Sequence, residues 1–250
     1  MFARILLCLL AVLLPVRAQN PSAAVESCFR EEGVTGCMAL YDEAHGWREY
    51  RPELTHERFV PASTFKIPNT LIGLETGVLP MQLAWDGVVR GNPGWDRDQD
   101  LASAFKASAA WYYQEMARRV GLEREKSWVV KLDYGNMHVG DRVDQFWLDG
   151  PLKISPREQV LFLRRLHDDE LPVRASSRRK LIRIMDQGEG IHAKTGWART
   201  PAMEYGWYVG WQDRTDGPVY FALLITQPPP APKDFYELRI RLAKKVLSTL

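Results

Sequence analysis

Apolar and polar positions alternate near both ends of the chain, and their period becomes helical in the middle. Residues 36–41 and 47–50 flank Asp42-Glu43-Ala44-His45-Gly46, a pattern that predicts two strands joined by a turn. Strand-like alternation returns after Ile191, in residues 205–211 and 219–226. These segments predict an antiparallel sheet to which both ends of the chain contribute.

The stretch between these strands, from residue 61 to about 185, carries apolar residues at helical spacing. It predicts helices over residues 64–75 and 101–120. Ser155-Pro156-Arg157-Glu158 combines a hydroxyl cap, a proline at the first helical position and a glutamate that can reach back to the cap, so another helix begins there. A last helix is predicted over residues 233–250, after a run of prolines. The sequence therefore predicts an α+β fold in which a mainly helical lobe is inserted into the sheet.

The first 18 residues have the layout of a secretory signal. Arg4 precedes the apolar run 5–14, which is followed by Pro15 and the small residue Ala18. This run is about half of the ~20 residues that a membrane-spanning helix requires. We therefore expect cleavage after Ala18, export of the chain, and no stable insertion into the membrane. A short N-terminal anchor that stays attached is the alternative.

The charge balance argues against nucleic acid as a partner. The whole chain has 33 Lys and Arg against 31 Asp and Glu. Loss of Arg4 and Arg17 with the signal would leave 31 of each, so the expected mature chain is formally neutral. A neutral chain lacks the basic footprint that nucleic-acid binding requires. With 46% hydrophobic residues and 9 each of Trp, Tyr and Phe, the chain is also too apolar to be disordered.

Cysteine and histidine usage gives no sign of a metal centre. Cys28 and Cys37 stay in the expected mature chain, and the sequence is compatible both with a disulfide between them and with two free thiols. The 5 histidines are scattered, and no cluster with ligand spacing occurs. We expect no metal cofactor.

Two stretches place a serine three residues before a lysine, on the same helical face: Ser63 with Lys66, and Ser177 with Lys180. A hydroxyl becomes a useful nucleophile when a neighbouring base takes its proton. Lysine can be that base only where burial lowers its pKa. Ser63 opens an apolar helix, whereas Ser177 stands among basic residues and is predicted to begin an exposed surface helix. We therefore select Ser63 and Lys66, with an ordinary helix-capping serine as the alternative.

A second candidate motif, Lys194-Thr195-Gly196, lies on a predicted strand late in the chain. The lysine supplies positive charge, the threonine hydroxyl can hold a carboxylate, and the glycine lets a ligand approach the strand closely. An S-x-x-K motif followed by K-T-G is typical of penicillin-interacting serine enzymes.

With these motifs in this order, the chain resembles the class D serine β-lactamases. The family's motifs are matched in sequence order over nearly the whole chain by Pro61-Ala62-Ser63-Thr64-Phe65-Lys66, Ser108-Ala109-Ala110, Tyr134-Gly135-Asn136, Phe146-Trp147-Leu148 and Lys194-Thr195-Gly196-Trp197. Arg239 is similar in position to the family's arginine for the substrate carboxylate. One residue departs from the pattern, because Ala110 stands where the family usually has valine and leaves more room for water beside the lysine.

The resemblance implies the penicillin-interacting fold: an antiparallel sheet flanked by N- and C-terminal helices, with the inserted helical lobe. Residues 19–250 would form one catalytic domain, with a sheet lobe at about 19–60 and 190–250 and a helical lobe at about 61–189. It also implies hydrolysis of a small-molecule β-lactam in the bacterial periplasm. The antibiotic spectrum would depend on the segments 81–98 and 198–205, and the sequence leaves the oligomeric state open.

The resemblance further implies the chemistry of the site. Ser63 would be the nucleophile, and the backbone amides of Ser63 and Trp197 would form the oxyanion hole. Lys66, N-carboxylated by carbon dioxide or bicarbonate, would be the general base, with no other cofactor. Trp147 would donate its indole N–H to the carbamate, and Ser108 with Lys194 would relay a proton to the leaving nitrogen. Substrate binding is assigned to Ala110, Tyr134, Asn136, Thr195, Gly196, Trp197 and Arg239.

Other functions fit part of the pattern. A penicillin-binding transpeptidase would more often carry S-x-N where this chain has Ser108-Ala109-Ala110, and a β-lactam sensor domain is normally joined to a transmembrane portion. A binding module without enzymatic activity would leave Ser63 and Lys194 unexplained. For single residues, the alternatives are Trp147 as core packing, Tyr134-Gly135-Asn136 as a turn, and Arg239 as a surface arginine.

Overall fold

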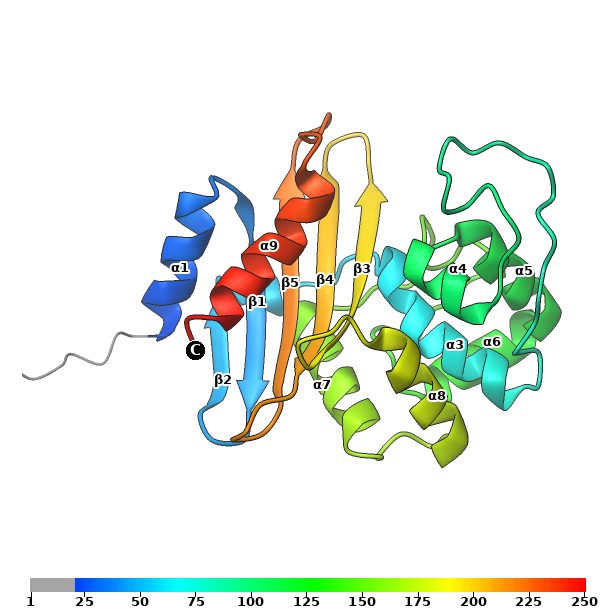
Figure 1. The fold of residues 1–250 in the computed structure, drawn as a ribbon, viewed down its shortest axis with the longest axis horizontal. Helices are drawn as coiled ribbons and strands as arrows, with labels where there is room; N and C mark the ends of the chain where they lie inside the picture. Colours follow the sequence, from blue (N-terminus) through cyan, green and yellow to red (C-terminus); the bar gives the residue numbers. More distant parts are fainter. Residues whose placement is uncertain (1–20) are drawn as a thin grey trace, which may run out of the picture.

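Five strands form one antiparallel sheet in the order β2-β1-β5-β4-β3 (Figure 1). The computed structural model describes residues 21–250, so the expected signal segment 1–18 lies outside the described residues. The strands are β1 (Thr35–Asp42), β2 (Gly46–Tyr50), β3 (Ile191–Arg199), β4 (Glu204–Gln212) and β5 (Val219–Gln227). The helices are α1 (Pro21–Glu31), α2 (Pro52–Thr55), η1 (Ala62–Phe65, 3-10), α3 (Lys66–Glu75), α4 (Leu101–Ala107), α5 (Ala110–Val120), α6 (Leu122–Lys131), α7 (Pro156–His167), α8 (Ala175–Met185) and α9 (Phe235–Leu247).

The sheet confirms the α+β prediction and separates two cores. Because side chains on a strand alternate between faces, β1 sends Cys37 and Ala39 to the core shared with the helical part of the chain. Met38 and Leu40 pack on the other face, where α1 and α9 lie. In Figure 1, α9 crosses in front of the sheet and α1 lies beside it.

The two cysteines lie in different cores and are free. Cys28, on α1, packs on one face of the sheet, whereas the Cys37 side chain lies in the core on the opposite face. A disulfide needs Cα atoms within about 7 Å and side chains that point toward each other. Because the sheet lies between them, Cys28 and Cys37 cannot form a disulfide, and of the two states compatible with the sequence the structure has two free thiols.

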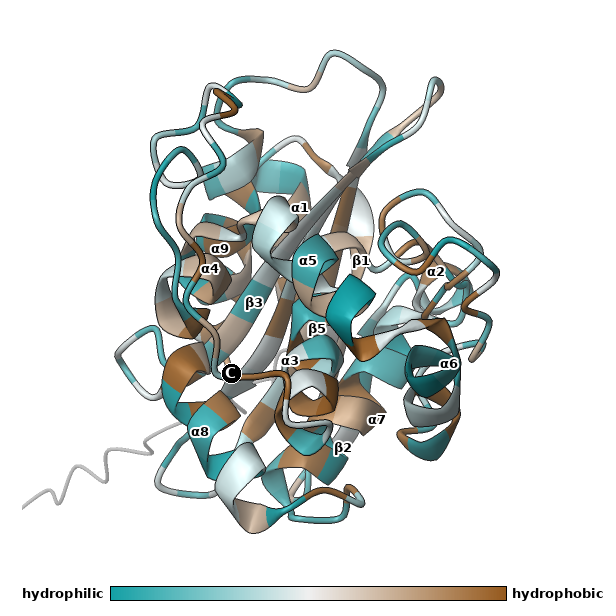
Figure 2. Cartoon of the chain, turned by 90° about the vertical axis from the view of Figure 1, so that its right-hand side faces the viewer, coloured by the Kyte–Doolittle hydropathy of each residue, from teal (hydrophilic) through white to brown (hydrophobic). Residues whose placement is uncertain are grey.

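Local sequence signals place the helix and strand boundaries well. The capping box at the start of α7 is present: the Ser155 hydroxyl accepts from the Glu158 amide at 3.1 Å, and the Glu158 carboxylate accepts from the Ser155 amide at 2.9 Å. The amphipathic α7 then packs on β1 and β5, opposite α9. Figure 2 shows hydrophilic and hydrophobic residues alternating along α7 and α8. The boundaries of the two predicted lobes stay a prediction.

One predicted helix, over residues 101–120, is wrong, because the chain there forms two helices. The first, α4, ends at Ala107, and the next residue, Ser108, adopts the left-handed conformation with φ 56°. A residue in this conformation cannot continue a right-handed helix, and α5 begins two residues later. Within residues 21–250, no helix has both the length and the apolar composition needed to cross a bilayer.

Candidate active site

Ser63 and Lys66 meet at the junction between η1 and α3. The Lys66 Nζ donates to the Ser63 Oγ at 2.9 Å. Ala62, directly before the serine, has φ 49° and donates its amide to the Trp147 carbonyl at 2.9 Å. A positive φ is costly for a residue with a Cβ, so it is held by its surroundings. This turn aims the Ser63 hydroxyl out of the core while Lys66 stays inside it.

Lys66 lies in an apolar environment that favours its neutral form. The side chain is 0% exposed, and its Nζ lies 5.0 Å from the centre of the Tyr113 ring. Burial penalises the ammonium form and lowers the pKa of Lys66 to about 7. The amine can therefore accept a proton near neutral pH, which is what activation of Ser63 requires.

Two polar side chains beside this pair lack a partner within residues 21–250. The Trp147 Nε1 and the Asn69 amide group are buried without a hydrogen bond. Trp147 stacks on Phe65, with ring centres 5.6 Å apart, so part of its role is core packing. A buried N–H donor without an acceptor is costly and rare in native proteins. The indole N–H of Trp147 is thus a free donor, and a carbamate on Lys66 would be a suitable acceptor for it.

Ser108 and Lys194 form a second hydroxyl and amine pair. The Lys194 Nζ donates to the Ser108 Oγ, and also to the Thr195 carbonyl at 3.0 Å. The break between α4 and α5 presents Ser108 to β3, which carries Lys194. Burial, followed by the charges of Lys66 and Arg239, holds the pKa of Lys194 well below its usual value. A lysine of this kind can release a proton more readily than an exposed one.

Gly196 lets β3 approach η1 closely. A Cβ at this position would lie 3.0 Å from the Pro61 carbonyl oxygen and 3.0 Å from the Thr64 Cγ2. Any larger residue would therefore push β3 away from the segment that carries Ser63. The close approach puts Ser63 and Trp197 on the wall of one cavity, although the oxyanion-hole assignment itself stays a prediction.

Arg239 projects from α9 to the same cavity. Its Nη1 donates to the Gly196 carbonyl at 2.7 Å, its side chain is only 7% exposed, and its Nε has no partner within the described residues. Burial lowers its pKa to about 10, and it has no carboxylate partner in residues 21–250. It is thus a buried cation rather than a surface arginine, with donors to spare for an anion.

The cavity has a volume of ≈ 630 Å³ and lies between the helical segments and the edge of β3. Seven predicted site residues line it: Ser63, Ser108, Ala110, Thr195, Gly196, Trp197 and Arg239. Lys66 and Lys194 are buried directly behind it and reach it through their hydroxyl partners. The structure thus brings together most of the residues that the motifs select.

Tyr134 and Asn136 lie elsewhere. Tyr134 is fully buried, and its ring contacts Phe65 edge-on at 5.5 Å in the core. Asn136 ties its turn to a neighbouring segment, since it donates to the Pro151 carbonyl at 2.8 Å and accepts from the Lys153 amide at 3.0 Å. Neither residue lines the cavity. Their contacts agree with the alternative interpretation, in which Tyr134-Gly135-Asn136 is a structural turn.

The second S-x-x-K copy differs from our expectation. Ser177 does lie in a helix, α8, but it is 4% exposed rather than on the surface. It is the third residue of the helix, on the side of this amphipathic helix that faces the core. No hydrogen bond joins Ser177 and Lys180 in residues 21–250. The prediction that Ser177 begins an exposed surface helix is wrong. The choice of Ser63 agrees with its hydrogen bond to Lys66.

Several cavity residues carry no motif and were missed individually. Arg90, Asn92 and Trp95 come from the segment 81–98, for which the sequence predicts a part in the antibiotic spectrum but selects no single residue. Lys106 and Tyr236 also line the cavity. The only sequence signal for them is a weak one, their distance from predicted site residues: Lys106 lies two residues before Ser108, and Tyr236 lies three residues before Arg239.

Comparison with known proteins places this geometry in a family. The penicillin binding protein transpeptidase domain matches residues 17–248. Beta-lactamase OXA-48 of Klebsiella pneumoniae is 39% identical over 228 residues, which are 88% of this chain and 84% of that protein. Beta-lactamase OXA-2 of Salmonella typhimurium is 38% identical over 210 residues, which are 80% of this chain and 75% of that protein.

The solved structures agree. The crystal structure of a class D β-lactamase from Nostoc is similar with a TM-score of 0.84 at 35% identity, covering 90% of this chain and 97% of that one. The class D β-lactamase FUS-1 of Fusobacterium nucleatum gives a TM-score of 0.84 at 33% identity, covering 90% of this chain and 96% of that one. The chain belongs to the class D β-lactamases.

Proposed function

We propose that this chain hydrolyses β-lactam antibiotics through an acyl-enzyme on Ser63, with Lys66 as the general base. As a class D β-lactamase, the chain is an enzyme of the hydrolase type. The observation that carries the mechanism is the 2.9 Å hydrogen bond between the Ser63 Oγ and a fully buried amine. A nucleophile joined to a base with a near-neutral pKa is what ring opening requires.

In the acylation step, Lys66 takes the hydroxyl proton while the Ser63 Oγ attacks the lactam carbonyl carbon. The amides of Ser63 and Trp197 stabilise the oxyanion, a task worth ~3 kcal/mol per donor. The C–N bond of the ring then breaks, and the leaving nitrogen takes a proton from the Ser108 and Lys194 pair. Thr195 and Arg239 hold the substrate carboxylate, because a buried guanidinium offers two parallel donors to it.

Water then cleaves the ester at Ser63, and this step needs a base as well. A carbamate formed on Lys66 from carbon dioxide would supply an oxygen base for this step as well as for acylation. Two features support the fit: the neutral form of Lys66 is accessible near pH 7, and the Trp147 Nε1 is a buried donor without a partner in residues 21–250. Ala110 lies on the cavity wall, and its small side chain would leave room for water to approach the lysine.

We also propose that the chain acts after export to the periplasm. The support is the layout of residues 1–18, with a basic start, a short apolar run and a small residue at the end. The expected mature N-terminus, Gln19, can be checked by mass spectrometry of the protein recovered from the periplasmic fraction.

The experiment for the main proposal is turnover of a chromogenic cephalosporin by the purified chain. We expect many turnovers per protein molecule, a higher rate with added bicarbonate, and none with the Ser63→Ala variant. A single stoichiometric acylation without release would instead indicate a penicillin-binding transpeptidase or a sensor. The family relationship does not favour that alternative.

A further inference from the structure

The cavity wall is strongly cationic. Four positively charged side chains line it, and no carboxylate does: Arg90, Lys106, Arg199 and Arg239. A β-lactam with one carboxylate needs one cationic site. The other three cations are therefore either neutralised by neighbours or available to a second negative group on the substrate.

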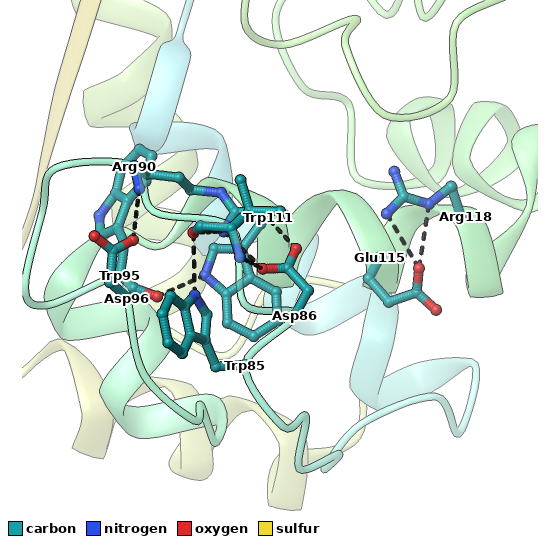
Figure 3. A network of polar contacts seen from close by, with 9 residues as sticks. Trp85, Asp86, Arg90, Trp95, Asp96, Trp111, Glu115 and Arg118 are labelled. Atoms are coloured by element: carbon teal, nitrogen blue, oxygen red, sulfur yellow. Dashed lines mark hydrogen bonds and ion pairs between the residues drawn. The ribbon is translucent and has the colours of Figure 1, made fainter.

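Arg90 is neutralised within its own loop. Its Nη2 lies 2.6 Å from the Asp86 Oδ2, and its Nη1 lies 2.9 Å from the Asp86 Oδ1. The Asp96 carboxylate accepts from the amides of Arg90 and Gly91, at 2.9 Å and 3.1 Å. Figure 3 shows this network of the loop beside Trp95 and Trp111. The guanidinium is thus held in a two-pronged pair and has little charge left for a ligand.

Arg199 and Arg239 are also engaged, the first in an ion pair and the second at the proposed carboxylate site. The Arg199 Nη2 lies 2.7 Å from the Glu204 Oε1, so its charge is paired across the β3–β4 turn. Arg239 is fixed on the Gly196 carbonyl, and together with Thr195 it forms the proposed site for the carboxylate of the β-lactam nucleus. Both lie on the sheet side of the cavity.

Lys106 is different from these three. It lies in the last turn of α4, on the helical side of the cavity, and it is exposed. Within residues 21–250 its ammonium has neither an ion-pair partner nor a hydrogen bond. The wall around it is fixed, because the Trp95 Nε1 donates to the Ala107 carbonyl at 2.7 Å and the Trp111 Nε1 donates to the Trp95 carbonyl at 2.9 Å.

We propose that Lys106 determines specificity by binding a second carboxylate, one carried by the acyl side chain of the substrate. The inference rests on the proposed function and names a substrate class for it: penicillins with two negative charges. Such a molecule places its ring carboxylate at Thr195 and Arg239 and its side-chain carboxylate on the helical wall. The ≈ 630 Å³ cavity has room for both groups.

The test compares two penicillins that differ in one carboxylate, carbenicillin and benzylpenicillin. In the Lys106→Met variant, we expect kcat/KM for carbenicillin to fall about fivefold relative to benzylpenicillin, the size of one partly exposed ion pair. Lys106→Arg should restore the ratio, and Lys106→Glu should lower it further. Lys153→Met, an exposed lysine outside the cavity, is the matched control and should leave the ratio unchanged.

Salt gives an independent readout. The ratio of kcat/KM for carbenicillin to kcat/KM for benzylpenicillin should fall with rising ionic strength in the unmodified chain. In the Lys106→Met variant, this ratio should not change with ionic strength. An equal change for both penicillins in Lys106→Met, or an unchanged ratio in Lys106→Glu, would overturn the inference. Turnover of benzylpenicillin by the unmodified chain tests the proposed function itself, so the two conclusions can fail separately.

Discussion

Replacing Lys66 is the most direct test of the mechanism, because the chain supplies its own control. Lys66 and Lys180 both follow a serine at a spacing of three residues. Lys66 is fully buried and bonded to Ser63, whereas Lys180 makes no hydrogen bond to Ser177 in the described chain. Lys66→Ala removes the proposed base, and Lys180→Ala removes an amine at the same spacing from a serine that has no role in the proposed mechanism.

The structure sets the size of the effect. An ordinary lysine has a pKa of ~10.4, so at pH 7 about one amine in a few thousand is neutral. Burial lowers the pKa of Lys66 to about 7, so about half of the amines are neutral at that pH. The gain in available base is therefore on the order of a thousandfold. General-base catalysis contributes about 10²–10⁴ in rate, and Lys66→Ala should lose a factor within that range.

The assay is kcat/KM for a chromogenic cephalosporin between pH 5.5 and 9. We expect a fall on the acid side as Lys66 takes up a proton, since the ammonium form can accept none. Lys180→Ala should follow the unmodified profile within a factor of about two. A similar loss in both variants would mean that the wrong serine has been chosen. Equal activity at pH 6 and pH 8 would show that Lys66 is not the base.

Three further outcomes are expected. Trp147→Phe keeps the aromatic packing but removes the buried N–H, so deacylation should slow more than acylation and mass spectrometry should detect trapped acyl-enzyme; its absence would contradict the role of Trp147. Gly196→Ala places a Cβ 3.0 Å from the Pro61 carbonyl oxygen, and acylation should slow at least tenfold while the thermal midpoint moves little. Burial raises the pKa of Glu125 to about 8, above its unfolded value, so stability is lost as pH rises from about 4.5 through 8. At 1.36 kcal/mol per pH unit this loss amounts to about 5 kcal/mol. Urea unfolding of the unmodified chain between pH 4.5 and 8 should show it, and urea unfolding of Glu125→Gln should not.

The sheet, the hairpin and the capping box could be predicted because their signals are local. Alternation with period two fixes which residues of β1 face each core, and a hydroxyl with a glutamate three residues later fixes the start of α7. The S-x-x-K spacing likewise determines that two side chains share a helical face. These features need no knowledge of what packs against them.

The remaining features depend on contacts between distant segments. The sequence shows neither that Ser108 breaks a helix nor that Ser177 is covered, because tertiary packing overrides local preference at both. The roles of Arg90 and Lys106 depend on the fold of their segments, because the loop that carries Arg90 brings it onto Asp86, whereas no acid reaches Lys106 in residues 21–250. Alternation along β1 does not show on which face α1 packs, so the separation of Cys28 from Cys37 depends on the position of the sheet between α1 and the helical part.

The pairing of β1 with β5 constrains how the chain can be made. Thr35 lies opposite Thr226, and Tyr41 lies opposite Tyr220. The two paired strands in the middle of the sheet are therefore far apart in the sequence and are synthesised at different times. A growing polypeptide lacking residues 219–227 has no partner for that side of β1, and closing so large a loop is slow. In a nascent chain, that side of β1 would therefore stay unpaired until residues 219–227 have emerged. Pulse proteolysis of ribosome-bound truncations before and after residue 227 would reveal the transition.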